Sequence, residues 1–317
     1  MTSRYGITIP FADVTLLEHR DWFHRLADLG YSDVWSSEVD GADGFTPLSV
    51  AALSEPRLNL GVAVTPTFTR GPGLRAMSIA AMAEVAGGRF TMGLGASSQP
   101  VVERWNGIAY DKPYQHTRDV LRFVKRALDG EKIDEVFETF EVHGFKLSRP
   151  VVERPPILLG ALRPGMLRLA GKEADGAILN WLAASDVAQC RAEVGEDKTI
   201  AARLFVIPTE DAGIARSIAR RMISAYLTVN VYAEFHRWLG RGDALSPMWE
   251  AWKVGDRKLA NEAIPDSVVD ELVIHGSFRE CREHVQRYVE AGVEIPSLAV
   301  ILAGVDLKEA VEGLAPR

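Results

Sequence analysis

Short apolar runs alternate with amphipathic segments along almost the whole chain. Residues 5–10 and 32–36 are compact apolar runs, which are typical of buried strands. Between them, residues 15–29 place Phe23 and Leu26 three positions apart among polar residues, which predicts a helix with one apolar face. The pattern therefore predicts strands and helices in strict alternation.

Eight strands are expected from this pattern, with helices between them. The predicted strands are residues 5–10, 32–36, 58–64, 90–94, 157–159, 177–180, 201–207 and 297–302. The predicted helices are residues 15–29, 46–53, 74–86, 114–128, 165–170, 186–194 and 307–314.

Glycines mark the corners between helices and the strands that follow them. Gly30, Gly171 and Gly292 each end a helical segment just before an apolar run. Glycine ends a helix readily because it adopts the left-handed conformation without a Cβ clash. Eight units of this kind favour a closed (β/α)8 barrel over an open doubly wound sheet. The 317 residues then form a single domain, since such barrels reach this length.

Two regions depart from the simple repeat. Residues 135–147 alternate between apolar and polar positions and predict a hairpin insertion. Residues 211–292 are mostly helical, and Pro247 and Pro265 are expected to break them into several helices. We therefore expect a helical excursion within about residues 229–275, which covers the substrate entrance or packs on a partner subunit.

Composition narrows the class of partner. The chain is 47% apolar and 25% charged, as is ordinary for a globular protein, and its net charge of −7 argues against nucleic acid or an anionic membrane as the main partner. No apolar run approaches the ~20 residues that a membrane span needs, and residues 1–10 lack a signal-peptide pattern. We expect a cytoplasmic protein whose two cysteines, Cys190 and Cys281, are reduced thiols.

Candidate chemistry belongs at the strand ends, because parallel barrels place their active sites there. These positions are rich in small, hydroxyl and amide side chains and poor in histidine. A metal hydrolase would need spaced histidines, and a glycosidase would need two acids. Only Glu38 is an acid that cleanly follows a strand, so we expect no metal and neither of these activities.

Two strands run into loops of small residues, at 89–98 and 156–164. Such loops let a backbone approach a flat or phosphorylated ligand closely. The second loop leads into a helix start, where free N–H groups and the helix dipole favour an anion. The loops indicate a cofactor enzyme.

Several motifs resemble a known family. Residues 69–72, 88–98, 103–107, 174–177 and 275–277 together resemble, in order and spacing, the luciferase-like monooxygenase superfamily, and most of all its F420-dependent oxidoreductase branch. The resemblance implies a barrel that binds coenzyme F420, or less often flavin mononucleotide (FMN), at the strand ends. It also implies hydride transfer at the cofactor ring.

The resemblance assigns cofactor contacts residue by residue. It implies a non-proline cis peptide bond between Ala63 and Val64, which bulges against the middle ring of the cofactor. It implies that the loop Gly160, Ala161 and Leu162 contacts the phosphate and the ribityl-like chain. The remaining expected cofactor contacts, around the ring and the tail, are Thr65, Ala96 and Asn180.

Two acids are candidates for proton transfer. Glu38 is followed by Val39, where relatives often have a histidine acid, so Glu38 either takes part in catalysis or pairs with an arginine. Glu103 matches an acid that some relatives use near the substrate. Beside Val102 and Trp105 its pKa could be raised, although it could equally be a solvated loop residue.

The sequence thus predicts an F420-dependent oxidoreductase that acts on a small organic molecule with an electron-poor double bond, carbonyl or imine. The alternatives are an FMN-dependent monooxygenase and a flavin-binding protein without turnover. Trp35, Trp105 and Trp181 are candidates for an aromatic wall, with core packing the stronger reading for Trp35. Family analogy favours a homodimer. Basic candidates for holding the cofactor tail are Arg70, Arg163 and Lys172.

Overall fold

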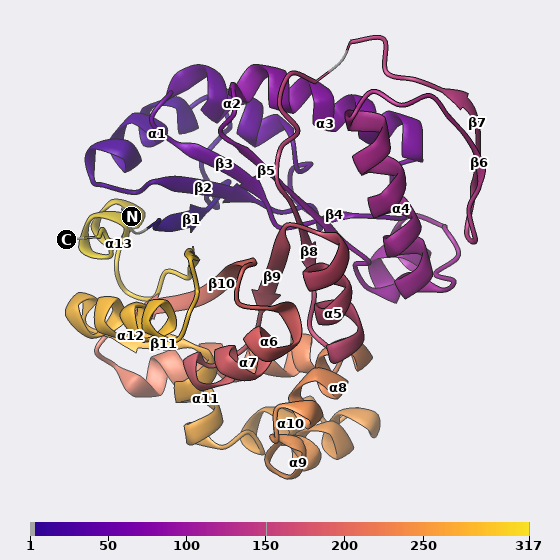
Figure 1. Ribbon diagram of the computed structural model, residues 1–317. Helices are drawn as coiled ribbons and strands as arrows, with labels where there is room; N and C mark the ends of the chain where they lie inside the picture. Colours follow the sequence, from indigo (N-terminus) through magenta and orange to yellow (C-terminus); the bar gives the residue numbers. More distant parts are fainter. Residues whose placement is uncertain (1–3, 150, 317) are drawn as a thin grey trace.

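The computed structural model describes residues 4–149 and 151–316 and shows a closed barrel of eight parallel strands (Figure 1). Pairing of the first strand with the last, and of the sixth with the seventh, closes the ring. The (β/α)8 prediction is confirmed. The barrel strands are β1 (Gly6–Thr8), β2 (Asp33–Ser36), β3 (Asn59–Val62), β5 (Phe90–Gly95), β8 (Ile157–Gly160), β9 (Gly176–Asn180), β10 (Thr199–Pro208) and β12 (Ile295–Val300).

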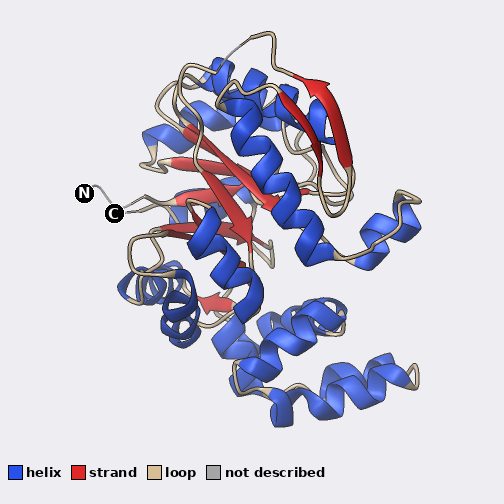
Figure 2. Cartoon of the chain, turned by 45° about the vertical axis from the view of Figure 1, so that its right-hand side comes forward, coloured by secondary structure: helices blue, strands red, loops and turns tan. Residues whose placement is uncertain are grey.

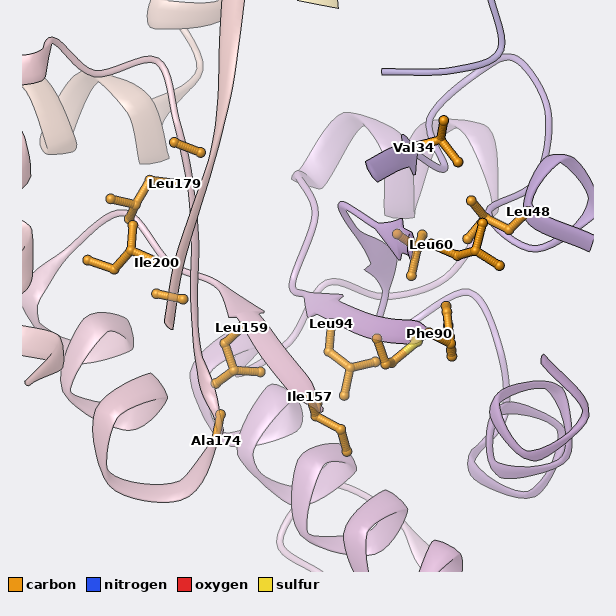
Figure 3. Close-up of a cluster of buried hydrophobic side chains, with 14 of the residues drawn as sticks. Val34, Leu48, Leu60, Phe90, Leu94, Ile157, Leu159, Ala174, Leu179 and Ile200 are labelled. Carbon is orange, nitrogen blue, oxygen red and sulfur yellow. The ribbon is translucent and has the colours of Figure 1, made fainter. Parts of the chain in front are cut away.

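Helices pack around the outside of the barrel, close to the segments where the pattern predicts them. They are α1 (His19–Asp28), α2 (Thr46–Ser54), α3 (Pro72–Ala86), α4 (Pro113–Leu128), α5 (Pro164–Glu173), α6 (Val187–Val194), α12 (Phe278–Glu290) and α13 (Leu307–Gly313). Their apolar faces bury the outward-facing strand residues. Figure 3 shows one such cluster, in which Leu60 of β3 lies near Leu48 of α2, and Leu94 of β5 lies near Ile157 and Leu159 of β8.

The interior of the barrel is filled by a second, smaller apolar cluster. Trp35 is the largest side chain of this cluster and packs with side chains from other strands, among them Ile178 and Ala201. Gly61 leaves room for the indole, because a Cβ there would lie 2.4 Å from Trp35 atoms. Trp35 is therefore a core residue rather than part of a ligand-facing wall.

The third predicted strand, residues 58–64, is interrupted in the structure. It ends at Val62, and the chain resumes as the two-residue strand β4 (Thr65–Pro66), which pairs with β5. The interruption coincides with a cis peptide bond between Ala63 and Val64. The apolar pattern does not reveal this break, because both sides of it are buried or partly buried.

The segment after β10 forms a group of helices on one side of the barrel (Figure 2). Pro265 separates two of them as predicted, whereas Pro247 lies inside one and does not break it. Burial of Leu245, Met248 and Trp249 on that helix offsets the intrinsic cost of proline, about 3 kcal/mol. The helices are α7 (Ala212–Leu227), α8 (Asn230–Trp238), α9 (Gly242–Lys253), α10 (Arg257–Glu262) and α11 (Asp266–Leu272).

Three further elements complete the fold. The strand β11 (Ile274–Gly276), which the helical pattern hides, pairs with the end of β10. The alternating segment forms an antiparallel hairpin of β6 (Ile133–Val136) and β7 (Glu141–Phe145). A π-helical turn, Pro100–Trp105, follows β5. Among the described residues, no helix combines the length and apolar character needed to cross a membrane.

Candidate active-site cleft

A cleft of about 860 Å³ lies at the carboxyl ends of the barrel strands and extends under α7 and α8. Its walls come from the loops after β2, β3, β5, β8 and β9. It brings together most of the predicted site residues, whereas Thr65 and Glu103 do not line it. Those in its lining are Glu38, Ala63, Val64, Ala96, Gly160, Ala161, Leu162 and Asn180.

The cis peptide bond expected between Ala63 and Val64 is present. Two glycines provide the space into which Val64 bulges. A Cβ on Gly95 would lie 2.5 Å from Val64 Cγ2, and one on Gly160 would lie 3.2 Å from Val64 Cγ1. The small residues at these strand ends therefore make room for the side chain of Val64, and this side chain determines where the cleft wall lies.

Thr65 supports this wall from behind. Its side chain is fully buried, and its Oγ1 accepts a hydrogen bond of 3.0 Å from Arg75 Nη1. Arg75 also donates to the carbonyl oxygen of Pro66, and burial lowers the pKa of its guanidinium to about 10. The contact fixes the chain after the cis bond.

Glu38 lies in the cleft wall with both carboxylate oxygens engaged. It pairs with the guanidinium of Arg70, and its Oε2 accepts a hydrogen bond of 2.9 Å from the backbone N–H of Gly44. Arg70 in turn lies over the ring of Phe45, 5.1 Å from its centroid. Of the two roles left open for Glu38, the geometry favours pairing with an arginine and holding the loop after β2.

Glu103 lies on the π-helical turn after β5. Its Oε2 accepts a hydrogen bond of 2.7 Å from Gln99 Nε2, and its Oε1 accepts one of 3.3 Å from the N–H of Tyr110. Trp105 is 57% exposed, so the apolar enclosure expected around Glu103 is open on that side. Glu103 therefore ties its turn to Gln99 and to the backbone at Tyr110.

The Gly160–Leu162 loop leads into the N-terminus of the ten-residue helix α5, as predicted. Gly165 and Met166, in the first turn of α5, line the cleft together with Arg163. The first turn of a helix has N–H groups without intrahelical partners, and its dipole favours a negative charge. This corner of the cleft therefore suits a phosphate or carboxylate group. Lys172 lies at the far end of α5 and does not line the cleft.

The opposite wall contains the predicted residue Asn180 together with polar groups that the sequence reasoning missed, namely Arg203, Tyr226 and Tyr232. Asn180 Nδ2 donates a hydrogen bond of 3.1 Å to Tyr232 Oη, while Asn180 Oδ1 is buried without a partner among the described residues. Burial raises the pKa of Tyr232 to about 12, so the phenol stays protonated at neutral pH. Tyr226 and Arg203 complete this wall. One signal was visible in the sequence, since Arg203 is the charged residue in the apolar run 201–207.

Trp105 lines the cleft, but Trp181 does not. Trp181 is buried and stacks on Phe205 with ring centroids 4.1 Å apart. The aromatic wall is formed instead by tyrosines from the helical segment. Among the described residues, no group of three or more histidines, cysteines or acids is arranged to hold a metal ion.

The chain belongs to the luciferase-like monooxygenase family, whose family model matches residues 4–294. This confirms the predicted resemblance. A Mycobacterium tuberculosis protein named as a putative coenzyme F420-dependent oxidoreductase is 26% identical over an alignment of 321 positions, which covers 90% of each chain. The 5,10-methylenetetrahydromethanopterin reductase of Methanolobus tindarius is 26% identical over 303 residues, which cover 91% of each chain.

The fold has a close counterpart among solved structures. The coenzyme F420-dependent tetrahydromethanopterin reductase from Methanopyrus kandleri superposes with a TM-score of 0.78, over 99% of this chain and 97% of its own. At 20% identity this likeness concerns the fold.

Proposed function

We propose that this protein is an F420-dependent oxidoreductase that transfers a hydride between the deazaflavin and a small organic substrate. The observation that carries the proposal is the Val64 bulge, which Gly95 and Gly160 accommodate beside the open N-terminus of α5. A flat ring fits against the bulge while a phosphate reaches the helix start. The names of the relatives support the same cofactor.

Coenzyme F420 supplies the hydride chemistry, and the residues of the chain bind and orient it. Ala63 and Val64 contact the ring. The loop from Gly160 to Leu162 and the first turn of α5 hold the phosphate, with Arg163 beside it. The unpartnered Oδ1 of Asn180 accepts a hydrogen bond from a ligand donor, and Ala96 lies on the wall between ring and tail.

The two predicted acids have supporting roles in this proposal. Glu38 and Arg70 hold the loop that carries Val39, so this loop presents an apolar side chain where relatives often have a histidine acid. Glu103 holds the turn after β5 through Gln99 and Tyr110. A small substrate then meets a mainly apolar cleft, from which water is largely displaced.

Two titrations of the purified protein test the cofactor, one with F420 and one with FMN, both followed by tryptophan fluorescence. Micromolar binding of F420 with much weaker binding of FMN is expected. The reverse order would move the protein to the FMN-dependent monooxygenases. Reduced F420 that binds but is never oxidised by any acceptor would indicate a binding protein without turnover. Binding of neither cofactor would contradict the proposal.

We also propose a homodimer that forms through α2 and α3. Both helices expose large apolar side chains: Leu53 is 80% exposed, Leu74 54% and Met77 50%. The two helices contact each other, and exposed apolar residues on neighbouring elements are typical of an interaction surface. Light scattering after size-exclusion chromatography should give twice the chain mass, and Leu53→Asp combined with Met77→Asp should give the monomer mass. A wild-type monomer would contradict this proposal.

A further inference from the structure

Arg203 places a positive charge at the floor of the cleft, inside the barrel. Side chains along β10 alternate between the interior and the surrounding helices, and Ala201 packs in the apolar cluster of the interior. Arg203, two residues further along the same face, therefore lies one layer above that cluster and lines the cleft.

The neighbours of Arg203 are neutral. Its register partners on the adjacent strands are Asn180 on β9 and Ser297 on β12. Thr8 and Ser36 line the same small hollow beneath it. These residues offer hydroxyl and amide groups and no negative charge.

No described residue neutralises this guanidinium. Arg203 makes neither an ion pair nor a hydrogen bond with the described residues, and its buried Nε has no partner. The ring of Phe205, 5.0 Å away, gives it only a cation–π contact. Of the acids in the cleft lining, Glu38 is paired with Arg70, and Asp40 is exposed.

Other buried arginines of this chain have acceptors within the protein. Arg241 pairs with Asp186 and Glu271, and Arg191 pairs with Glu294 and donates to backbone carbonyls. Arg75 has no acid partner among the described residues but donates to Thr65 Oγ1 and to backbone carbonyls. A partly buried guanidinium with neither a counterion nor an acceptor is costly, so its retention indicates a ligand that supplies both.

We propose that Arg203 binds the carboxylate of the substrate, and that the substrate is therefore a small organic acid. This inference rests on the proposed function. In the order of strands around the barrel, β10 lies opposite β3, so Arg203 faces the Val64 bulge across the mouth. A carboxylate on Arg203 places the rest of the substrate between that bulge and the tyrosines of α7 and α8. The hydroxyl of Tyr232, held by Asn180, is a neutral donor beside the same group.

Matched acids and amides test the inference. Crotonate, trans-cinnamate and their amides are titrated into the full-length protein, with and without oxidised F420, and binding is measured by calorimetry. The variants are Arg203→Met, which keeps an unbranched stem but removes the charge, Arg203→Lys, which keeps the charge, and Arg20→Met on the exposed face of α1 as a matched control. The affinity of each variant for F420 is measured separately.

The wild-type protein is expected to bind the acids at least about tenfold more tightly than the amides. Arg203→Met should weaken acid binding about 10- to 100-fold and leave amide binding within about twofold, since a hydrogen bond to a charged group has this strength. Arg203→Lys should fall between these limits, and Arg20→Met should match the wild type.

Two results would overturn the inference and leave the proposed function intact. One is an equal affinity of the wild-type protein for acids and amides, which needs no variant to fold. The other is a loss of F420 binding in Arg203→Met with acid binding unchanged, because the anion on Arg203 would then belong to the cofactor. Failure of F420 to bind any of the proteins would instead contradict the proposed function, and the titrations without cofactor would still decide the role of Arg203.

Discussion

The two walls of the cleft are built in different ways. The wall from β3, β5 and β8 consists of backbone and small residues, in which Gly95 and Gly160 accommodate Val64. The wall from β9, β10 and α8 consists of long side chains, in which Asn180 contacts Tyr232 and Arg203 is unpaired within the described residues. The first wall suits a cofactor that many relatives share, because its shape depends on few side chains. The second suits a particular substrate, because its donors can change one by one.

The largest expected effect comes from adding a side chain to the wall of β3, β5 and β8, which we call the glycine wall. Gly95→Ala places a Cβ 2.5 Å from Val64 Cγ2, so the bulge must move. We expect a loss of about 1–3 kcal/mol in the free energy of unfolding, as overpacking commonly costs, and at least about tenfold weaker F420 binding. Urea denaturation and fluorescence titration measure the two effects.

The double variant Gly95→Ala/Val64→Ala removes the clash and should regain much of the lost stability. Gly71→Ala is the matched control, since a Cβ there meets nothing within 4 Å. Equal losses in the double and single variants would show that Val64 is not what Gly95 accommodates.

The wall of β9, β10 and α8, which we call the helical wall, should lose more stability in acid than the glycine wall. Burial, aided by the positive charge of Arg241, lowers the pKa of His236 on α8 to about 3. The unfolded chain binds a proton at this histidine near its ordinary pKa of about 6.5, so between these two values the unfolded state holds a proton that the native state lacks. The stability that this group contributes is fully present above pH 6.5. It is lost as the pH drops below that value, by up to about 1.4 kcal/mol for each pH unit.

His236→Phe should remove that share of the acid slope in denaturation curves measured from pH 7 to pH 4. His143→Gln in the exposed hairpin provides the comparison and should retain the slope. An unchanged slope in His236→Phe would show that the acid sensitivity arises elsewhere in the protein. The two walls would then not differ in their response to acid.

A smaller effect is expected at the start of α5. Arg163→Gln removes a charge that lines the cleft beside the helix N-terminus and should weaken F420 binding about 3- to 10-fold. The difference should shrink as salt is raised, because an exposed charge is screened. Lys172→Gln, on the same helix but outside the cleft lining, should bind F420 as the wild type does. An equal loss in both variants would indicate a general charge effect.

The smallest effect is expected at Glu103. Glu103→Gln keeps one acceptor oxygen, so it retains the hydrogen bond from Gln99 or the one from Tyr110 but not both. Because Glu103 does not line the cleft, turnover should stay within about threefold of the wild type. Steady-state rates with a substrate found by screening measure this. A decrease in turnover of a hundredfold or more, with F420 affinity unchanged, would identify Glu103 as the proton donor. Proton transfer would then take place on the side of the glycine wall.

The two walls also differ in how much of each could be predicted from the sequence. The apolar runs and glycine corners predict all eight barrel strands, because burial on both faces and the left-handed turn act locally. The glycine wall follows from the same short-range signals and from motif resemblance. Pro247 and β11 escaped this reasoning, because packing of α9 and pairing with β10 outweigh the local preference.

By itself the sequence determined the barrel, the strands that end in loops of small residues, and the family to which the chain belongs. The tertiary structure decided which polar groups meet. Asn180, Arg203 and Tyr232 come from two strands and a helix, and register and helix packing bring them to one wall. It also decided that Glu38 is paired with Arg70, because a partner 32 positions away becomes a neighbour only when the strand ends converge. Local patterns encode elements, whereas the partners of charged side chains depend on contacts that form only when the barrel closes.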